Sequence, residues 1–360
     1  MKKKKFSMEK FKFDQRIQMG YYSANYFNKT SLLIQKYKPN ETVCIQFMHF
    51  SKAPVKVCGI NETVQLLKNF LDKAALKKIQ IYGVKDGDLV SGKKPVLLIF
   101  GPYQYFGKYE NIIDGILARR SSVCNNCYQM LKLIKPDQLL FMADRTDDYL
   151  LQPYDGYSAY VGGVRHFVTQ ASTAFIKDPS VTVSGTIPHA LIQQFDGDLT
   201  EAMQTYIKEF GANNAVALVD YHNDVIAEIK KIAKKIKNIY AIRIDTSNNM
   251  LDKSLQPKYR KCKNAYGVSP YLIKLARKTL DQCGMQRTKI VVSGGIDNQK
   301  IIKYLKAKCP IDFYGVGSNL IARNVHFTAD LVLKNNRHEA KTGRKLFISI
   351  NKVKTLTKYL

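Results

Sequence analysis

One arrangement occurs four times between residues 183 and 321: a short apolar run, a few polar or glycine residues, and then a helical stretch. The apolar runs end in Val-Asp at Asp220, Arg-Ile-Asp-Thr at residues 243–246, Ser-Gly-Gly at residues 293–295 and Gly-Val-Gly-Ser at residues 315–318. Apolar strands that alternate with helices form parallel sheets, which often close into barrels. Because the loops after the carboxyl ends of such strands meet at one face, these polar endings predict one shared site. We therefore interpret the chain as an enzyme built on an α/β barrel.

The hydrophobic pattern predicts the individual elements of this barrel. Strands are expected over residues 215–219, 240–244, 289–292 and 311–314. Helices are expected over residues 199–209, 224–237, 270–283 and 298–306. The spacing between successive strand ends is typical of repeated strand–loop–helix units.

The first part of the chain has a different pattern of expected elements. Strands are expected over residues 42–50 and 95–100, and a helix over residues 61–72 with Asn61 as its N-cap. Residues 110–133 are expected to be mostly helical and to lead into the barrel. We predict an N-terminal α/β domain over residues 1–125, a catalytic barrel over residues 126–325, and a C-terminal segment, residues 326–360, that packs back on the first domain.

Composition limits the classes of protein to consider. The 360 residues are 45% hydrophobic, which is normal for globular cores, and no apolar run approaches the ~18 residues that span a bilayer, so no membrane partner is expected. The basic start of the chain lacks the apolar stretch of a signal peptide, and seven cysteines, an odd number, favour a reducing compartment. We therefore expect a cytoplasmic protein. Cys124 and Cys127 have zinc or redox spacing without a second pair nearby, and we interpret them as ordinary thiols on a helix.

The net charge of +28 raises the alternative of a nucleic-acid-binding protein. The lysines are spread along the chain instead of forming one stripe, and many fall on expected helix faces. No nucleic-acid partner is therefore expected. The positive field would still attract phosphorylated substrates.

Two glycine-containing endings predict a phosphate site. Ser293, Gly294 and Gly295 precede Ile296-Asp297 and an expected helix, so backbone N–H groups lie beside a helix N-terminus. Gly315, Gly317 and Ser318 repeat the arrangement one unit later. Tight turns are the plainer explanation of either sequence, but barrels commonly bind phosphate between the loops after two neighbouring late strands.

The other endings carry charged side chains. Arg243 and Asp245 alternate along one strand end, so both side chains point the same way, either as a buried ion pair or as part of a site. Asp220 follows a wholly apolar strand and is placed to hold a ribose hydroxyl or a metal-bound water. His189 lies in Gly-Thr-Ile-Pro-His, at an expected strand-to-helix turn, where an imidazole can act as nucleophile or proton carrier. Arg145 is a candidate for gripping an anionic group through two hydrogen bonds.

Together these stretches resemble the nicotinate phosphoribosyltransferase family, which has the type II phosphoribosyltransferase fold. In the barrel, the resemblance runs through residues 144–157, 161–163, 185–191, 218–220, 243–246, 292–295 and 314–318. In the first domain it runs through residues 25–30, 86–88, 94–97 and 110–117.

The resemblance implies a fold and an activity. Its members join an N-terminal α/β domain, completed by C-terminal residues, to an irregular α/β barrel, and they act as dimers with the active site at the subunit interface. They combine nicotinate with phosphoribosyl pyrophosphate to give nicotinate mononucleotide and pyrophosphate for NAD synthesis, with ATP as co-substrate and Mg²⁺ as cofactor. Some relatives carry a C-terminal zinc module, but no cysteine follows Cys309 here, so no zinc is expected.

Roles carry over to the matching residues. By resemblance, His189 is the histidine that ATP phosphorylates, and Arg145 and Arg243 surround nicotinate and pyrophosphate. Asp220 and Asp245 match the carboxylates near ribose and Mg²⁺. The remaining substrate-binding residues expected by the same resemblance are Thr186, Thr246, Ser293, Gly294, Gly295, Gly315, Gly317 and Ser318. An aromatic group is expected from the neighbouring subunit, supplied by Tyr26 and Phe27.

Several alternatives remain open at this stage. Quinolinate or nicotinamide could replace nicotinate as the base, although Thr146, where many relatives have a second basic residue, argues against the doubly charged quinolinate. The main alternative that is not an enzyme is a non-catalytic barrel that binds nucleotides. Intact His189, Asp220, Arg243 and Asp245 argue against it.

Overall fold

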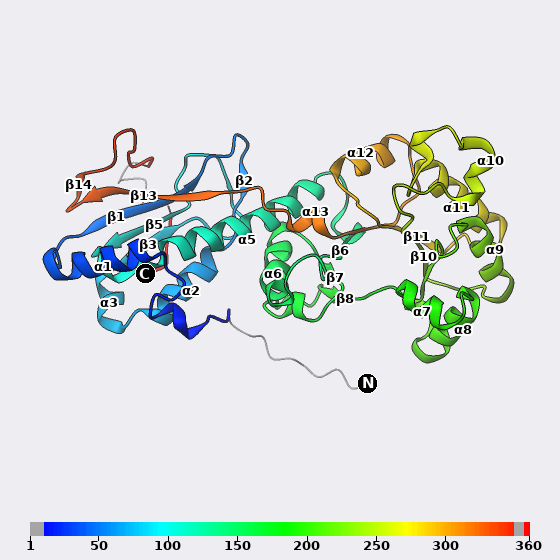
Figure 1. Ribbon diagram of the computed structural model, residues 1–360, viewed down its shortest axis with the longest axis horizontal. Coiled ribbons are helices and arrows are strands. Elements are labelled where there is room, and N and C mark those ends of the chain that lie inside the picture. The colour runs from blue at the N-terminus through cyan, green and yellow to red at the C-terminus, as the bar shows by residue number, and fades with distance from the viewer. Residues whose placement is uncertain (1–10, 349–355) are drawn as a thin grey trace.

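The computed structural model describes residues 11–348 and 356–360. In this part of the chain, a six-stranded antiparallel sheet has the order β14-β13-β1-β5-β3-β15, and a seven-stranded parallel sheet has the order β8-β7-β6-β12-β11-β10-β9. Figure 1 shows the two sheets at opposite ends of an elongated molecule, with helix α5 running between them. The short strands β2 (Val55–Lys56) and β4 (Leu89–Val90) pair with each other separately.

The antiparallel sheet combines both ends of the described chain. Its strands are β1 (Val43–His49), β3 (Gln80–Gly83), β5 (Leu97–Gly101), β13 (Phe327–Lys334), β14 (Arg337–His338) and β15 (Thr357–Lys358). Strand β13, which follows the barrel in sequence, pairs with β1 along the whole of β1. The strands predicted over residues 42–50 and 95–100 are confirmed as β1 and β5. The division of the chain into three domains stays a prediction.

Helices cover one face of this sheet (Figure 1). They are α1 (Asn25–Tyr37), α2 (Ile60–Phe70), α3 (Lys73–Lys78) and α4 (Tyr103–Phe106). The predicted helix over residues 61–72 is confirmed as α2, but the N-cap at Asn61 is wrong. Gly59 is the N-cap, and Asp86 Oδ1 accepts a hydrogen bond from the N–H of Ile60 at 2.8 Å. A carboxylate from a distant turn thus replaces the predicted local cap. The residues around position 61 do not include this carboxylate, so they could not predict it.

Helix α5 (Glu110–Met130) confirms the helix predicted over residues 110–133 and belongs to both parts of the molecule. Ile113 and Leu117 pack into the core under the antiparallel sheet. Val123 and Cys127, further along the same helix, pack into the core of the parallel sheet. One continuous helix therefore connects the two cores without a linker.

The parallel sheet is a curled, incomplete barrel. Its strands are β6 (Leu139–Phe141), β7 (His166–Phe167), β8 (Thr182–Val183), β9 (Val216–Leu218), β10 (Ala241–Ile244), β11 (Lys289–Val292) and β12 (Phe313–Val316). The strands predicted over residues 215–219, 240–244 and 289–292 are confirmed. The last one is displaced: residues 311–314 were predicted, whereas β12 extends to Val316 because Gly315 and Val316 pair with β6. Strands β8 and β9 form the two open edges of the sheet.

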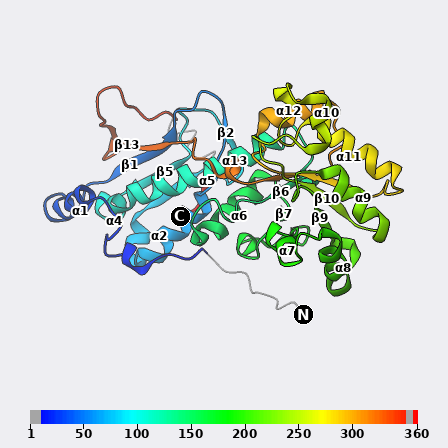
Figure 2. The same cartoon turned by 45° about the vertical axis from the view of Figure 1, so that its right-hand side comes forward.

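Helices surround this sheet, as Figure 2 shows with the barrel turned forward. They are α6 (Gln152–Gly162), α7 (His189–Gln194), α8 (Leu199–Phe210), α9 (Val225–Lys235), α10 (Gln256–Tyr259), α11 (Pro270–Gln282), α12 (Asn298–Lys306) and α13 (Ser318–Ile321). The four helices predicted from periodicity are confirmed as α8, α9, α11 and α12. Each has a local N-cap side chain, supplied by Asp198, Asp224, Ser269 and Asp297.

Candidate active site

Arg243 lies at the centre of the polar strand ends. Its Nε donates to Ser293 Oγ at 2.8 Å, and its Nη1 donates to Thr186 Oγ1 at 2.8 Å. Its Nη2 donates to Asp245 Oδ2 at 2.9 Å. One guanidinium therefore connects the segments that follow β8, β10 and β11, which only a planar group with a fixed fork of donors can do.

Arg243 and Asp245 point to the same side, as their alternation along β10 predicts. Asp245 Oδ1 also accepts a hydrogen bond from Ser293 Oγ at 2.6 Å. The alternative interpretation, a buried ion pair, is confirmed only for the pairing and not for the burial. The two side chains do pair, but they keep 15% and 17% of their surface exposed and so remain accessible to a ligand.

His189 and Asp220 form a second contact nearby. His189 is the first residue of α7, and its Nε2 lies 3.3 Å from Asp220 Oδ1. The imidazole is 46% exposed whereas the carboxylate is only 7% exposed. Burial raises the pKa of Asp220, the nearby His189 opposes this rise, and the negative charge of Asp245 adds to it. Asp245 is therefore close enough to interact with Asp220, which joins the two contacts into one polar group.

The same contacts bridge the open edge of the barrel. Strands β8 and β9 are not hydrogen-bonded to each other. The bond between Arg243 and Thr186 and the contact between His189 and Asp220 both connect the segment after β8 to the strands on the other side of this gap. Side chains of the site thus connect the two edges of the sheet that backbone hydrogen bonds would join in a closed barrel.

The turn after β11 has the backbone needed to hold an anion. Gly294 and Gly295 have φ values of +89° and +61°, which favour glycine. A Cβ on Gly294 would lie 3.3 Å from Asp245 Oδ1, so the turn also packs closely on the site. Within the described chain, no backbone carbonyl accepts the N–H of either glycine. These two donors are available to a ligand.

The helix that follows the glycine turn has a side-chain cap of its own. Asp297 is the N-cap of α12, and its Oδ1 accepts a hydrogen bond from Lys300 N at 2.7 Å. One of the N–H groups at this helix end is therefore used within the protein. The role of the helix N-terminus in binding an anion stays a prediction.

The second glycine ending has a different local role from the first. Gly315 lies inside β12, not in the loop after it, and a Cβ there would come 2.6 Å from Met142 Sδ. A Cβ on Gly317 would come 2.8 Å from Met142 O. Both glycines let β12 and the end of β6 approach each other. Ser318 begins α13, directly after this contact.

Lys300 is a site residue that the motif reasoning missed. Its Nζ donates to Gly294 O at 2.9 Å and to Asn248 Oδ1 at 2.8 Å, so it ties the glycine turn to the loop after β10. Desolvation by burial lowers the pKa of its ammonium group. A signal was present in the sequence: a lysine in the first turn of a helix opposes the helix dipole, which indicates another use for its charge.

The remaining predicted residues are placed as follows. Arg145 is exposed in the loop after β6, at the same edge of the sheet as the other endings. Thr246 is buried beside Asp245, and its Oγ1 has no hydrogen-bond partner among the described residues. Tyr26 and Phe27 lie on α1, with ring centroids 4.4 Å apart. Figure 1 shows α1 at the far end of the molecule from β10, so one chain does not bring these aromatics to the site.

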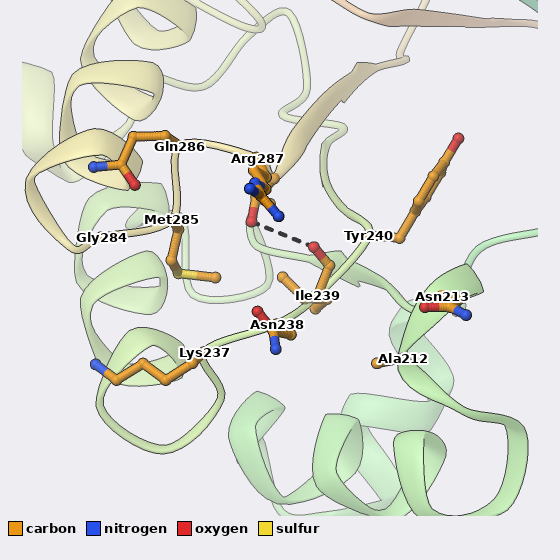
Figure 3. Close-up of a pocket in the computed structure, with 11 residues that line it drawn as sticks. Ala212, Asn213, Lys237, Asn238, Ile239, Tyr240, Gly284, Met285, Gln286 and Arg287 are labelled. Carbon is orange, nitrogen blue, oxygen red and sulfur yellow. Dashed lines mark hydrogen bonds between the residues drawn. The ribbon is translucent and has the colours of Figure 1, made fainter.

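Two cavities on the barrel lie away from the centre of this polar group. Figure 3 shows a cavity of about 580 Å³ lined by segments that precede β10 and β11, including Lys237, Tyr240 and Arg287. It therefore lies at the opposite ends of the strands from the polar group. An apolar groove of about 450 Å³ between α7 and α8 is closer, since Thr186 contributes to its lining.

The cysteines give no sign of a metal centre. Cys124 and Cys127 are free, buried thiols on α5, so their predicted place on a helix is confirmed, while their interpretation as ordinary thiols stays a prediction. Across residues 11–348 and 356–360, no group of three or more His, Cys, Asp or Glu side chains is arranged to hold a metal ion. In the same residues, no helix is long and apolar enough to cross a bilayer.

Comparison with known proteins agrees with the motifs. Residues 26–121 match the family described as quinolinate phosphoribosyl transferase, N-terminal domain. The chain is 25% identical to a nicotinate phosphoribosyltransferase of Mycobacterium tuberculosis, over 76% of this chain and 58% of the relative. It is also 25% identical to the nicotinate phosphoribosyltransferase of Bacillus subtilis, over 67% of this chain and 45% of the relative. The chain thus spans about half the length of these curated relatives.

Solved structures show the fold. A nicotinate-nucleotide pyrophosphorylase from Pyrococcus furiosus superposes with a TM-score of 0.75 at 24% identity, covering 94% of this chain and 82% of that one. Human nicotinic acid phosphoribosyltransferase superposes with a TM-score of 0.66 at 14% identity, covering 90% of this chain and 77% of that one. The chain is therefore a homologue of the nicotinate phosphoribosyltransferases and has the type II phosphoribosyltransferase fold, as its motifs predicted.

Proposed function

We propose that this protein transfers the phosphoribosyl group of phosphoribosyl pyrophosphate to nicotinate, forming nicotinate mononucleotide and pyrophosphate with ATP hydrolysis, as the first step of NAD salvage from nicotinate. The observation that carries the proposal is the hydrogen-bonded group centred on Arg243, which joins Thr186, Asp245 and Ser293 beside a glycine turn with free N–H groups. The names of the curated relatives support the same activity.

Each part of the substrate has a matching part of the site. The 5′-phosphate fits the N–H groups of Gly294 and Gly295, with the ammonium of Lys300 beside them. Ribose hydroxyls fit the carboxylates of Asp220 and Asp245. The diphosphate and the nicotinate carboxylate are anionic, and the guanidinium groups of Arg243 and Arg145 are the donors for them.

The reaction needs charge stabilisation more than acid–base chemistry. The bond from ribose C1 to the diphosphate oxygen breaks, positive charge grows on C1, and negative charge collects on the leaving group. The carboxylates of Asp220 and Asp245 stabilise the first charge, and Arg243 stabilises the second. The pyridine nitrogen then forms the new bond to C1.

The two carboxylates also fit Mg²⁺. No third acidic side chain joins them in the described chain, so substrate oxygens and water would complete the coordination, which is how Mg²⁺ is commonly bound beside phosphates. When bound, the ion would neutralise the charge of the diphosphate.

His189 is the group that would couple ATP to the reaction. Its exposed ring can attack the γ-phosphorus of ATP, so that an N–P bond forms while the bond to the ADP oxygen breaks. Contact of Nε2 with Asp220 orients the imidazole and stabilises positive charge on it. A phosphohistidine here would lie next to the carboxylates that face the ribose.

We further propose that the active form is a homodimer or a larger homo-oligomer. Large apolar side chains are strongly exposed on α1 and the segment before it: Met19, Tyr21, Tyr22, Tyr26, Leu32, Leu33 and Tyr37. Exposed large apolar side chains gathered in one segment of chain favour an interaction site. A second chain would cover it and bring Tyr26 and Phe27 to the partner's barrel. We keep the cytoplasm as the proposed compartment, supported by seven free cysteines.

Quinolinate is the second candidate base, favoured by the family description that residues 26–121 match. The test is pyrophosphate release from phosphoribosyl pyrophosphate with nicotinate, quinolinate or nicotinamide, each with and without ATP. We expect release with nicotinate and stimulation of it by ATP. Release with quinolinate, accompanied by CO₂, would assign the other activity, and no release with any base would favour a non-catalytic nucleotide-binding barrel.

A further inference from the structure

A half-buried arginine, Arg119, ties helix α5 to the loop that carries Arg145. Arg119 Nε and Nη2 donate to both carboxylate oxygens of Asp155 on α6, at 3.0 and 2.6 Å. The third nitrogen, Nη1, lies 2.9 Å from Asp147 Oδ2. Asp147 stands in the loop after β6, two residues beyond Arg145. The guanidinium thus joins two helices and one loop of the candidate site.

The two carboxylates differ in what they do for the arginine. The side chain of Asp155 is only 6% exposed, so its pairing with Arg119 is required to offset the cost of burying its charge. The side chain of Asp147 is 41% exposed and could be satisfied by water instead. The pair with Asp155 therefore holds the fold together, whereas the pair with Asp147 mainly fixes where the loop lies.

The network continues away from the site. Arg120, the next residue of α5, binds both oxygens of Glu62 on α2 at 2.7 and 3.0 Å, and its Nη1 lies 3.9 Å from Asp155. Its guanidinium also lies 4.6 Å from the ring centroid of Tyr154 on α6. Contacts within α5 and α6 therefore fix the position of Arg119, so that its guanidinium presents a positive charge to the loop in one place.

The loop has few other ties near Arg145. Gln152 Nε2 donates to Asp144 O at 2.9 Å, and Asp148 caps the short helical turn that follows. Arg145 itself is exposed. An exposed arginine that is to grip an anion through two hydrogen bonds must be held in one place, because disorder before binding lowers affinity.

We propose that the ion pair between Arg119 and Asp147 positions the loop after β6 and so holds Arg145 ready for the carboxylate or phosphate of the substrate. Arg119 and Asp147 are positioning residues that act through Arg145. The identity of the substrate rests on the proposed function, but the effect of the ion pair on the loop does not.

The test uses Asp147→Asn, which removes the ion pair and leaves the buried Arg119–Asp155 pair intact. Hydrogen–deuterium exchange of the full chain without substrate should show amides of residues 143–147 exchanging about 5-fold faster. The KM for nicotinate should rise about 5- to 10-fold while kcat stays within about 2-fold. The reason is that Arg145 is expected to bind the ground state and the transition state equally well, so weaker binding changes KM and not kcat. The double variant Arg119→Lys with Asp147→Asn should have no higher KM than the worse of the two single variants.

Asp137→Asn is the matched control, because Asp137 undergoes the same change of charge at the other end of β6 and its side chain is 89% exposed. It should alter neither exchange nor KM. Unchanged exchange and unchanged KM in Asp147→Asn would overturn the proposal while leaving the proposed function standing. Absence of activity in the unmodified protein would overturn the proposed function, and the exchange measurement would still decide whether the ion pair holds the loop.

Discussion

At the scale of single residues, the candidate site depends on groups that perform more than one task. Arg243 donates three hydrogen bonds to three different segments, and Asp245 accepts from both Arg243 and Ser293. Burial raises the pKa of Asp220, the contact with His189 opposes this rise, and the negative charge of Asp245 adds to it. Changing one of these side chains therefore alters the geometry of the others.

Replacing Arg243 by lysine should lower kcat/KM for phosphoribosyl pyrophosphate by about 100-fold, because one ammonium cannot reach three acceptors in different directions. The charge is retained, so a purely electrostatic role would leave most of the activity. Steady-state kinetics of pyrophosphate release measures the difference. Arg277→Lys, which alters an arginine that binds backbone oxygens at the other end of β11, is the control for stability.

Replacing His189 by alanine should abolish the stimulation by ATP and leave slow, ATP-independent transfer. The reason is that the exposed imidazole is the group proposed to accept the phosphoryl group, whereas the phosphate and ribose contacts lie on other residues. Pyrophosphate release with and without ATP is the measurement. Equal stimulation in the variant and the unmodified protein would exclude a phosphohistidine at this position.

At the scale of elements, helix α5 joins the two cores and carries an unusual acidic face. Glu110 and Asp114 are one turn apart on it, and Asp330 on β13 faces them. Burial raises the pKa of Glu110 to about 8 and that of Asp114 to about 7, and the negative charge of Asp330 adds to both shifts. Asp330 is paired with Arg344, whose Nε lies 2.9 Å away, but Asp114 Oδ1 is buried without a partner among the described residues.

This acidic face predicts how stability depends on pH. Below pH ~3, the carboxyl of Asp114 is protonated in both the folded and the unfolded state, so it has little effect on stability. As the pH rises from the unfolded pKa of 3.8 to the folded pKa of about 7, the unfolded chain ionises first, so the folded state loses stability. Asp114→Asn should therefore raise the free energy of unfolding by about 1 to 2 kcal/mol at pH 8, allowing for partial exposure, and change it little at pH ~3. Urea unfolding at both pH values checks this, and an equal effect at the lower pH would contradict it.

At the scale of the whole molecule, the elongated shape separates the aromatic residues of α1 from the strand ends (Figure 1). Within one chain, Tyr26 and Phe27 cannot serve the site formed by Arg243 and His189. The apolar side chains of α1 are also exposed in the single chain. Because of this exposure and this separation, we expect that two chains complete each other's sites.

Replacing Leu32 and Leu33 together by aspartate should therefore convert the protein to monomers and lower kcat by at least about 10-fold, because charges at the centre of an apolar interface are desolvated without partners. Both side chains are more than half exposed in the single chain, so its folding should be unaffected. Sedimentation velocity measures the oligomeric state and circular dichroism checks the fold. An active monomer would show that one chain suffices.

The sequence alone predicted strands β9 to β12 and helices α8, α9, α11 and α12 of the barrel, and it placed polar side chains at the ends of those strands. Helices such as α11 and α12 were predictable because their caps and apolar spacing are local. Asp220, Arg243 and Asp245 stood out in the sequence because they are charged residues at the ends of apolar runs. Only the tertiary structure decided contacts between distant segments. These include Asp86 capping α2, Thr186 and His189 bridging the open edge between β8 and β9, and Lys300 and Arg119 tying the loops. The physical reason is range: capping and periodicity act within one or two turns of chain, whereas the partner of a buried charge is set by which segments the packed cores bring together.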